Sequence, residues 1–199
     1  MTETSPDILL LVGSPHEEGK STQFAQALME QFVTRGVKPL LYHLSKYPVA
    51  ACYNCGYCLH TGTCRIVNDP WGVLSRHLET ADALVLVAPV YFAGPSAHLK
   101  AALDRCQVFW SRKYVLHEGV PAKRPAYLVE IGDGGDPFGT YPLEAICTSA
   151  LNCANLRIGT NVYPLIGEAY DLSRACGIVE DVMANLGKET SYMKSRAKP

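Results

Sequence analysis

The feature that most limits the possible folds is a short run, DALVLVA, at residues 82–88. After its first residue the run is apolar without interruption, whereas a strand with one face in water alternates apolar and polar side chains. A strand of this kind is buried on both faces, as in the centre of a parallel sheet that helices cover on both sides. The chain is therefore expected to contain β-α-β units.

Other short apolar segments recur along the chain, and each is followed by a stretch with helical spacing. Strands are predicted at residues 7–13, 37–44, 82–88, 124–132 and 155–165, and helices at residues 20–35, 70–80, 96–112, 140–154 and 168–187. Asp69 before Pro70, and Ser96 after Pro95, mark two of the helix starts. Five alternations of strand and helix predict a flavodoxin-like, doubly wound α/β fold: a five-stranded parallel sheet of order 2-1-3-4-5 with helices on both faces.

The composition indicates one domain over residues 1–199. Hydrophobic residues make up 48% of the chain, enough for one sizeable core, and no shift in composition marks a boundary. The polar end, residues 188–199, is expected to fray.

Charge and cysteine content limit the possible partners and compartment. A formal net charge of -1 provides no basic field for nucleic acid or an anionic membrane. No apolar run approaches the roughly 20 residues of a spanning helix, and the polar N-terminus MTETSPD does not resemble a secretory signal. We therefore expect a cytoplasmic protein whose eight cysteines are reduced thiols, metal ligands or redox groups.

In a doubly wound sheet, ligands bind beyond the carboxyl ends of the strands where the winding reverses, here between the first and third strands. The loop after the first strand is GSPHEEGKST, residues 13–22, and the loop after the third opens the segment PVYFAGPSAHLKAALDR, residues 89–105. These two loops are therefore the expected ligand site.

The first loop is close to the nucleotide-binding P-loop but departs from it. Five residues separate Gly13 from Gly19 where the P-loop has four, and Pro15 removes a backbone N–H donor. The third strand also ends without the acid that would hold Mg²⁺, so a P-loop kinase is only a remote alternative. Hydroxyl groups at a helix N-terminus suit a single terminal phosphate, although an ordinary capped turn would have the same pattern.

Both loops resemble the flavin-binding loops of the flavodoxin-like NAD(P)H-dependent FMN reductases. The resemblance implies that FMN is bound and that its phosphate contacts Ser14, His16, Ser21 and Thr22. The residues implied along the ribityl chain and ring are Pro89, Val90, Tyr91, Phe92 and Gly94. Lys20 stands where the family more often has Asn, and it either contacts the phosphate or faces solvent. Asp133 and Gly134, after the fourth strand, either reach the flavin edge or form an ordinary turn.

A cysteine-rich loop, residues 52–64, lies between the second strand and the helix predicted at residue 70. Its four thiols, Cys52, Cys55, Cys58 and Cys64, have the spacing CxxCxxCxxxxxC. Such tight clustering suits a 4Fe-4S cluster, whereas structural zinc more often takes two separated pairs, and four free or redox-labile thiols are the third alternative. The spacing resembles that of the iron-sulfur flavoproteins, a branch of the same family. In this fold the loop is expected to reach the flavin edge.

The resemblance implies an FMN-dependent oxidoreductase that takes a hydride from NAD(P)H and passes electrons to a quinone, flavin, metal or iron-sulfur acceptor, with or without a 4Fe-4S cluster. No side chain is predicted as a catalytic acid or base, because the cofactor carries the chemistry. The alternative is a non-enzymatic electron carrier that ferredoxin reduces. The family also implies a homodimer or homotetramer with the flavin near a subunit interface. Asp104 and Arg105 close the family motif, and we expect them to have a structural role, such as one at a subunit contact, and not a chemical one.

Overall fold

The computed structural model describes residues 6–119 and 121–196, with side chains through residue 186. The strands are β1 (Ile8–Val12), β2 (Pro39–His43), β3 (Ala83–Tyr91), β4 (Gly94–Pro95), β5 (Arg124–Gly132), β6 (Leu156–Arg157) and β7 (Val162–Ile166). The helices are α1 (Lys20–Thr34), α2 (Cys58–Thr61), α3 (Trp71–Thr80), α4 (Ala97–Arg105), α5 (Gln107–Tyr114), α6 (Tyr141–Cys153), the 3-10 turn η1 (Gly167–Ala169) and α7 (Arg174–Arg196).

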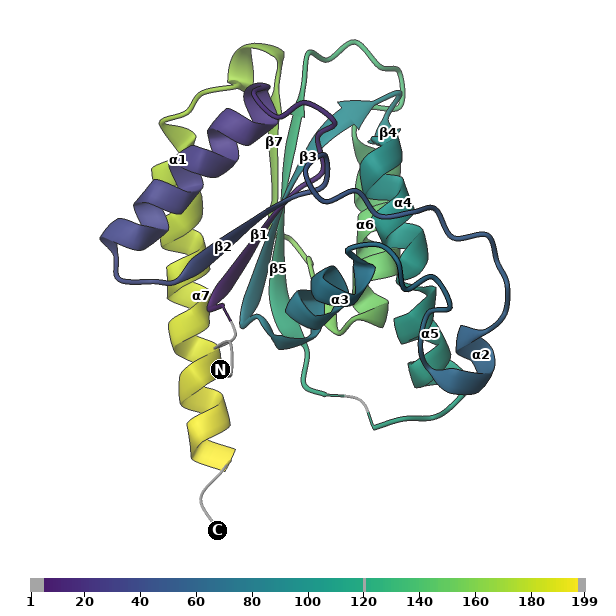
Figure 1. The fold of residues 1–199 in the computed structure, drawn as a ribbon. Helices are drawn as coiled ribbons and strands as arrows, with labels where there is room; N and C mark the ends of the chain where they lie inside the picture. Colours follow the sequence, from purple (N-terminus) through teal and green to yellow (C-terminus); the bar gives the residue numbers. More distant parts are fainter. Residues whose placement is uncertain (1–5, 120, 197–199) are drawn as a thin grey trace.

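A mainly parallel sheet runs through the middle of the molecule, with α1 and α7 on one face and α3 to α6 on the other (Figure 1). Its order is β2-β1-β3-β5-β6, with β7 also paired to β5. This is the predicted order 2-1-3-4-5, because β6 and β7 are two pieces of the predicted fifth strand. The break between them includes Gly159, whose φ of 58° is one that glycine adopts readily.

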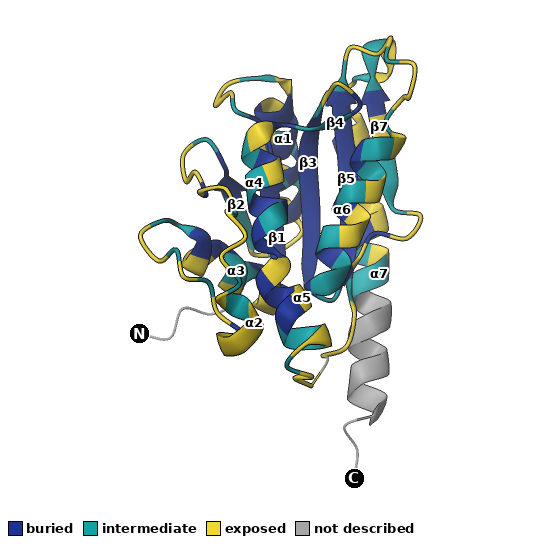
Figure 2. Cartoon of the chain, turned by 90° about the vertical axis from the view of Figure 1, so that its right-hand side faces the viewer, coloured by how far each residue is buried: buried dark blue, intermediate teal, exposed yellow. Residues whose placement is uncertain are grey.

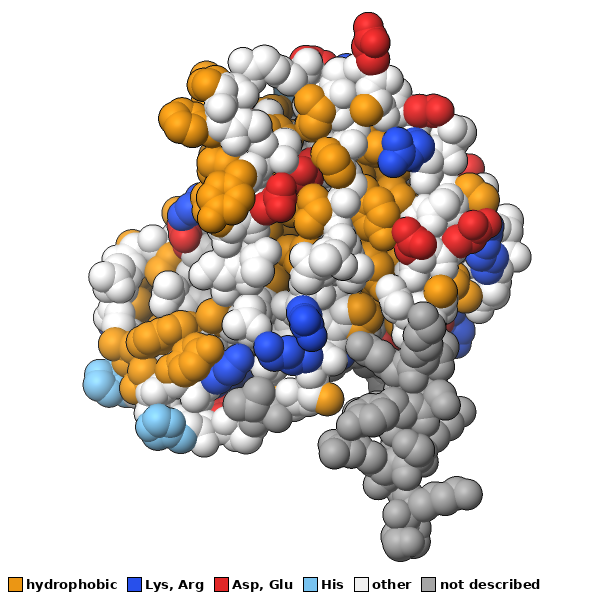
Figure 3. Space-filling view, turned by 180° about the vertical axis from the view of Figure 1, so that it is seen from behind, with side chains coloured by type: hydrophobic (Ala, Val, Ile, Leu, Met, Phe, Trp, Pro, Cys, Tyr) orange, Lys and Arg blue, Asp and Glu red, His pale blue; other side chains and the backbone are white. Residues whose placement is uncertain are grey.

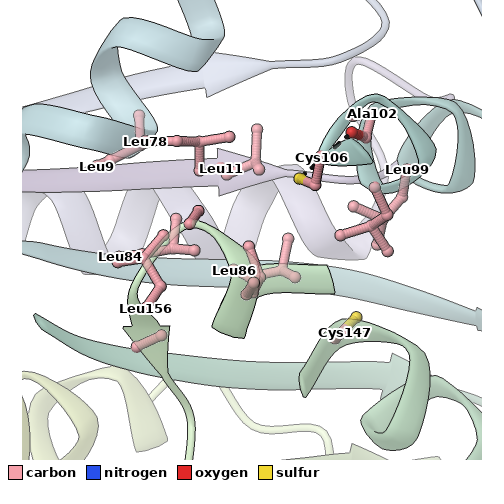
Figure 4. Packing of buried hydrophobic residues seen from close by; sticks show 14 of the residues in the cluster. Leu9, Leu11, Leu78, Leu84, Leu86, Leu99, Ala102, Cys106, Cys147 and Leu156 are labelled. Atoms are coloured by element: carbon pink, nitrogen blue, oxygen red, sulfur yellow. Dashed lines mark hydrogen bonds between the residues drawn. The ribbon is translucent and has the colours of Figure 1, made fainter. Parts of the chain in front are cut away.

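Strand β3 is buried on both faces, as its sequence predicts (Figure 2). Its alternate side chains enter two separate apolar clusters, with Leu84 and Leu86 in one and Val85 and Val87 in the other. Figure 4 shows the first cluster, where leucines of β1 and β3 lie with Leu99 of α4. These two clusters hold the helical layers against the sheet and so fix its carboxyl edge.

Two sequence predictions of helices need correction, and one short helix was not predicted. The helix predicted at residues 96–112 is two helices, α4 and α5. The backbone departs from regular α-helical geometry at Cys106, where ψ is -6°. The last helix begins at Arg174 and not at residue 168, because the Asp171 carboxylate accepts hydrogen bonds from the backbone and side chain of Ser173. The short helix α2 within the cysteine-rich loop was not predicted.

Two further expectations concern the chain ends and membranes. The backbone of α7 extends through Arg196, while residues 197–199 and the side chains from residue 187 on lie outside the described residues, so the fraying of residues 188–199 stays a prediction. In the described part of the chain, no helix combines the length and apolar character that a membrane span requires.

Candidate functional site

The loop that follows β1 is fixed where the first and third strands lie side by side. Gly13 donates its N–H to the Val87 carbonyl at 2.9 Å, and its own carbonyl accepts a hydrogen bond from the Ser96 hydroxyl at 2.5 Å. A Cβ at Gly13 would lie 2.9 Å from Leu99, so only glycine fits here without a shift. Ser96 also accepts a hydrogen bond from the Leu99 N–H, which confirms it as the cap of α4.

The start of α1 presents several free donors at this place. Among the described residues, the backbone N–H groups of Gly19, Lys20 and Ser21 have no hydrogen-bond partner. The hydroxyl-bearing residues Ser14 and Ser21 are only 3% and 4% exposed, and Ser14 accepts a hydrogen bond from the His16 N–H. Donors of this kind, together with the dipole of a 15-residue helix, form a suitable binding site for an anion.

The hydroxyl of Thr22 is already used inside the loop. It donates to the His16 carbonyl at 3.0 Å and lies 2.8 Å from Nε2 of His43. Because Nδ1 of His43 accepts from the Ser45 N–H, its Nε2 carries the proton in the neutral ring and donates to Thr22. Burial lowers the pKa of His43 and favours this neutral form. Thr22 therefore supports the loop, and a contact between its hydroxyl and phosphate stays a prediction.

Lys20 connects this loop to the one that follows β5. Its ammonium lies 2.8 Å from the Asp133 carboxylate, and both side chains are largely exposed. The hydrogen bond to Asp133 raises the pKa of Lys20, and the same bond lowers the pKa of Asp133. The backbone carbonyl of Lys20 also accepts from the Tyr170 hydroxyl. The two sides of the site are thus joined through a charged pair that solvent can reach.

A cavity of about 710 Å³ lies beside this pair, at the carboxyl ends of β3, β5 and β7. The predicted residues that line it are Val90, Tyr91, Phe92, Asp133 and Gly134. Its remaining lining residues, which the sequence analysis missed, are Ala93, Gly132, Gly135, Asp136, Pro137, Gly139, Thr140, Pro164 and Ile166. Pro89 and Gly94 do not line it, because Pro89 pairs with Ile131 in the sheet and Gly94 belongs to β4.

One rim of the cavity is a tight hairpin between β3 and β4. Tyr91 pairs with Gly94, which leaves Phe92 and Ala93 as the turn, with φ of 50° and 59°. Two successive positive φ values define a type I′ turn, which asparagine or glycine would occupy with less strain. The Leu143 N–H holds the turn through the Ala93 carbonyl at 2.9 Å, and the Phe92 side chain is fully exposed. The backbone is therefore strained where an exposed aromatic ring meets the cavity.

The four thiols of the cysteine-rich loop line a second and much smaller cavity of about 60 Å³. The Ser111 hydroxyl of α5 donates to Sγ of Cys58 at 3.3 Å. Hydrogen bonds from the Tyr57 N–H and the Tyr53 side chain lower the pKa of Cys55. Among the described residues, no three His, Cys, Asp or Glu side chains are placed to hold a single metal ion.

A single buried arginine fastens both ends of this loop. The guanidinium of Arg105 donates to the carbonyls of Ala50 and Ile66, each at 3.0 Å, and to the Asp69 carboxylate at 2.8 Å. The guanidinium carbon of Arg105 also lies over the ring of Trp71, 5.3 Å from the ring centroid. Burial opposes ionisation of Asp69, but its hydrogen bonds from Arg105 and from backbone N–H groups hold the pKa of Asp69 below its usual range. Arg105 thus has the structural role predicted for it, inside its own chain.

The position of the thiols differs from the one expected. The loop leaves the carboxyl edge of the sheet after β2 and then runs along α4, so that α2 lies against α5, away from the larger cavity (Figure 1). None of the four cysteines lines the cavity at β3 and β5. Figure 3 shows hydrophobic side chains gathered over α2 and α5, where Tyr57, Leu59, Trp110 and Tyr114 are exposed.

The sequence matches the family described as NADPH-dependent FMN reductase over residues 6–136, which is more than half of the chain. The chain belongs to the NADPH-dependent FMN reductase family. The match includes the loop after β1, the hairpin, the cysteine-rich loop and the first part of the loop after β5.

Individual relatives of this FMN reductase family member are iron-sulfur flavoproteins. One from Methanocaldococcus jannaschii is 31% identical over 98 residues, which are 49% of this chain and 50% of the relative. Another, from Archaeoglobus fulgidus, is 30% identical over 136 residues, 68% of this chain and 66% of the relative. For the first of these, the chain spans about half of the relative's length.

Solved structures of low sequence identity share the fold. The apo form of an NADH:FMN oxidoreductase superposes with a TM-score of 0.59 at 16% identity, covering 88% of this chain and 87% of that one. An azoreductase from Bacillus anthracis superposes with a TM-score of 0.53 at 14% identity, covering 91% of this chain and 96% of the azoreductase. These likenesses confirm the flavodoxin-like α/β fold of this FMN reductase family member.

The residues along the carboxyl edge of the sheet fit FMN. The free N–H groups and buried hydroxyls at the start of α1 suit its phosphate, and the cavity lies within the 300–1,000 Å³ typical of cofactor sites. A side chain at Gly132 would be crowded, because a Cβ there would lie 3.2 Å from the Val90 side chain. The backbone of this FMN reductase family member therefore lines the cavity directly beside β3.

Proposed function

We propose that this chain is an FMN-dependent oxidoreductase that takes a hydride from NAD(P)H and passes the electrons to a quinone, flavin, metal or iron-sulfur acceptor. The observation that carries the proposal is a donor-rich helix start, connected through the Lys20–Asp133 pair to a cavity of about 710 Å³ at the carboxyl ends of β3, β5 and β7. When bound, FMN supplies the chemistry, because its ring accepts a hydride and releases electrons singly or in pairs.

In this proposal the residues of the chain bind FMN and orient it. Ser14 and Ser21 hold the phosphate through their hydroxyls and the neighbouring backbone N–H groups, while Asp133 and Gly134 face the ring from the loop after β5. Tyr91 and Phe92 cover one rim of the cavity. No side-chain acid or base is assigned to the hydride transfer itself.

FMN binding is tested by titrating the FMN-free protein and following the fluorescence of the flavin. The double variant Ser14→Ala/Ser21→Ala removes the two hydroxyls that we propose contact the phosphate, and it should weaken binding about tenfold to a hundredfold, at about 1 kcal/mol per hydrogen bond. Ser149→Ala, on the exposed face of α6, is the matched control and should bind FMN as the wild type does. A wild-type protein that takes up no FMN would contradict the proposal.

Rapid mixing separates an enzyme from an electron carrier. If the chain is a reductase, NADH or NADPH should bleach the flavin absorption of the FMN-loaded protein within seconds. Bleaching by reduced ferredoxin alone would instead favour a non-enzymatic electron carrier. Comparison of the two nicotinamides in the same experiment gives the preferred donor.

We further propose that Cys52, Cys55, Cys58 and Cys64 hold a 4Fe-4S cluster. The supporting observation is that all four line one small cavity, although no three of them enclose a single ion. A cubane offers each thiolate a separate iron, so its ligands need not converge on one point. The similarity to iron-sulfur flavoproteins supports the same assignment.

Iron analysis of protein purified without oxygen tests the cluster. We expect about four irons per chain and a broad brown absorption. Cys58→Ser should lose the iron, whereas Cys176→Ser, a change of an exposed thiol outside the loop, should keep it. Iron that stays far below the FMN content after anaerobic reconstitution would refute the cluster and leave a loop of free thiols.

We also propose a homodimer or homotetramer in the cytoplasm. Phe92, Phe138 and Tyr141 are 73% or more exposed near the cavity, which is unusual for rings of this size unless another surface covers them. Cysteines that form no disulfide suit a reducing compartment. Light scattering after size exclusion gives the oligomeric state, and a monomer at all concentrations would contradict it.

A further inference from the structure

A buried carboxyl group without partners lies beneath the larger cavity. Glu130 of β5 is 0% exposed, and among the described residues neither of its oxygens has a hydrogen-bond partner. An ionised carboxylate in such a place is costly, and burial raises the pKa of Glu130 to about 7. The group therefore changes its charge within the physiological pH range.

The groups around Glu130 include two that titrate, Glu144 and Cys147, both on α6. In the sheet its partners are Ala88 of β3 and Pro164 of β7, which carry no charge. The negative charge of Glu144 raises the pKa of Glu130, and the Thr140 hydroxyl lowers it without completing a hydrogen bond to either oxygen. Among the described residues, no cation shifts the pKa of Glu130.

Glu130 is also next to the lining of the cavity. It precedes the lining residue Gly132 by two positions, which is about 7 Å along a strand, and its sheet partner Pro164 lines the cavity as well. Thr140 lines the same cavity and donates to the half-buried Glu144 carboxylate at 3.3 Å. These two polar side chains lead from the region of Glu130 toward the surface.

We propose that Glu130 is a proton-holding residue of the flavin site: its carboxylate takes up one proton from solvent, by way of Thr140 and Glu144, when a hydride enters the cavity. When the two electrons leave, Glu130 returns its proton to solvent, and the proton that arrived with the hydride is released to the acceptor or to solvent. The inference rests on the proposed FMN-dependent function. The hydride brings two electrons and one proton, so it adds one negative charge to the cavity, and the proton taken up on Glu130 offsets that charge. Glu130 itself is neither oxidised nor reduced.

The physical basis is that, among the described residues, no cation contributes to the charge balance at Glu130, and Lys20 at the edge of the cavity is already paired with Asp133. A new negative charge in the cavity next to a buried carboxylate favours the protonated form of that carboxyl. Below about pH 7 the carboxyl is protonated whether or not the cavity is charged, so no extra proton is taken up. Above that pH, Glu130 takes up one proton with each pair of electrons. This continues until the pH exceeds the higher pKa that Glu130 has when the cavity is negatively charged.

The midpoint potential of bound FMN, followed by its absorption at several pH values, tests this. Above about pH 7 the wild type should show a slope steeper than that of Glu130→Gln by one proton per two electrons, or about 30 mV per pH unit. FMN affinity is measured first for both proteins. Equal slopes in two proteins that bind FMN alike would overturn the inference and leave the proposed function intact.

Two further variants and one FMN-free measurement keep the test decisive if Glu130→Gln fails to fold. The steeper slope should begin at lower pH in Glu144→Gln, which removes a negative charge, and at higher pH in Thr140→Val, which removes the hydroxyl. In FMN-free wild type, the infrared carbonyl band of a protonated carboxylic acid should disappear as the pH rises through about 7. No such band, or unchanged onsets in both variants, would overturn the inference even if FMN binds.

Discussion

Arg105→Lys should destabilise the protein by about 2 kcal/mol. The guanidinium reaches three groups, the carbonyls of Ala50 and Ile66 and the carboxylate of Asp69, from its two terminal nitrogens. The single nitrogen of lysine can keep Asp69 and at most one carbonyl, so one buried carbonyl loses a charged donor, at about 1.5–3 kcal/mol. For a chain of this length, 2 kcal/mol corresponds to a fall of about 4–8 °C in the unfolding midpoint.

Urea unfolding of the FMN-free protein, followed by circular dichroism, measures this loss. The matched control is Lys100→Met, which breaks the exposed pair with Asp104 and should cost less than about 0.5 kcal/mol. The loop ends should also loosen, so Cys52 and Cys64 of the Arg105 variant should react faster with a thiol reagent. A loss of stability no larger than that of the control, with unchanged thiol reactivity, would refute the assigned role of Arg105.

Three other predictions concern stability and the site. The free energy of unfolding of the wild type should fall by about 3 kcal/mol between pH 4.5 and 7, because the folded state keeps the Glu130 proton that the unfolded state releases, and urea unfolding of Glu130→Gln should lack this fall. Phe92→Gly should raise stability by about 0.5–1 kcal/mol by relieving the left-handed turn, and a loss in the same assay would contradict the strain. Gly13→Ala should cost about 1–3 kcal/mol by overpacking against Leu99 and should weaken FMN binding in a fluorescence titration, so an unchanged affinity would count against the placement of the phosphate.

Most of the architecture could be predicted because it depends on local patterns. The uninterrupted apolar run of β3 indicates its central place, and Ser96 after Pro95 indicates the start of α4. The break at Cys106 could not be found, because neither glycine nor proline stands there. The start of α7 could have been predicted from the sequence. Asp171 lies two residues before Ser173, and an aspartate in this position is a pattern typical of a helix start.

The site was predicted in part for the same reason. The two loops could be identified from their order along the chain, and three of the five residues predicted on the second loop line the cavity. The pairing of Arg105 with Asp69 joins positions 36 apart, and no spacing rule links them. Glu130 had a signal that was overlooked, a single acid inside the apolar strand PAYLVEIG. Contacts with FMN, NAD(P)H or iron stay predictions.

The double attachment of the cysteine-rich loop makes it an Ω-loop, a compact excursion whose ends lie close together. Because Ala50 and Ile66 meet at one side chain of α4, the fifteen residues between them can change in length or sequence without moving a strand. The thiols are thus carried on an exchangeable module, attached to a sheet that does not depend on them. Relatives of this chain could lose or alter the cysteines of this loop in a few substitutions and still keep the cavity at the carboxyl edge intact.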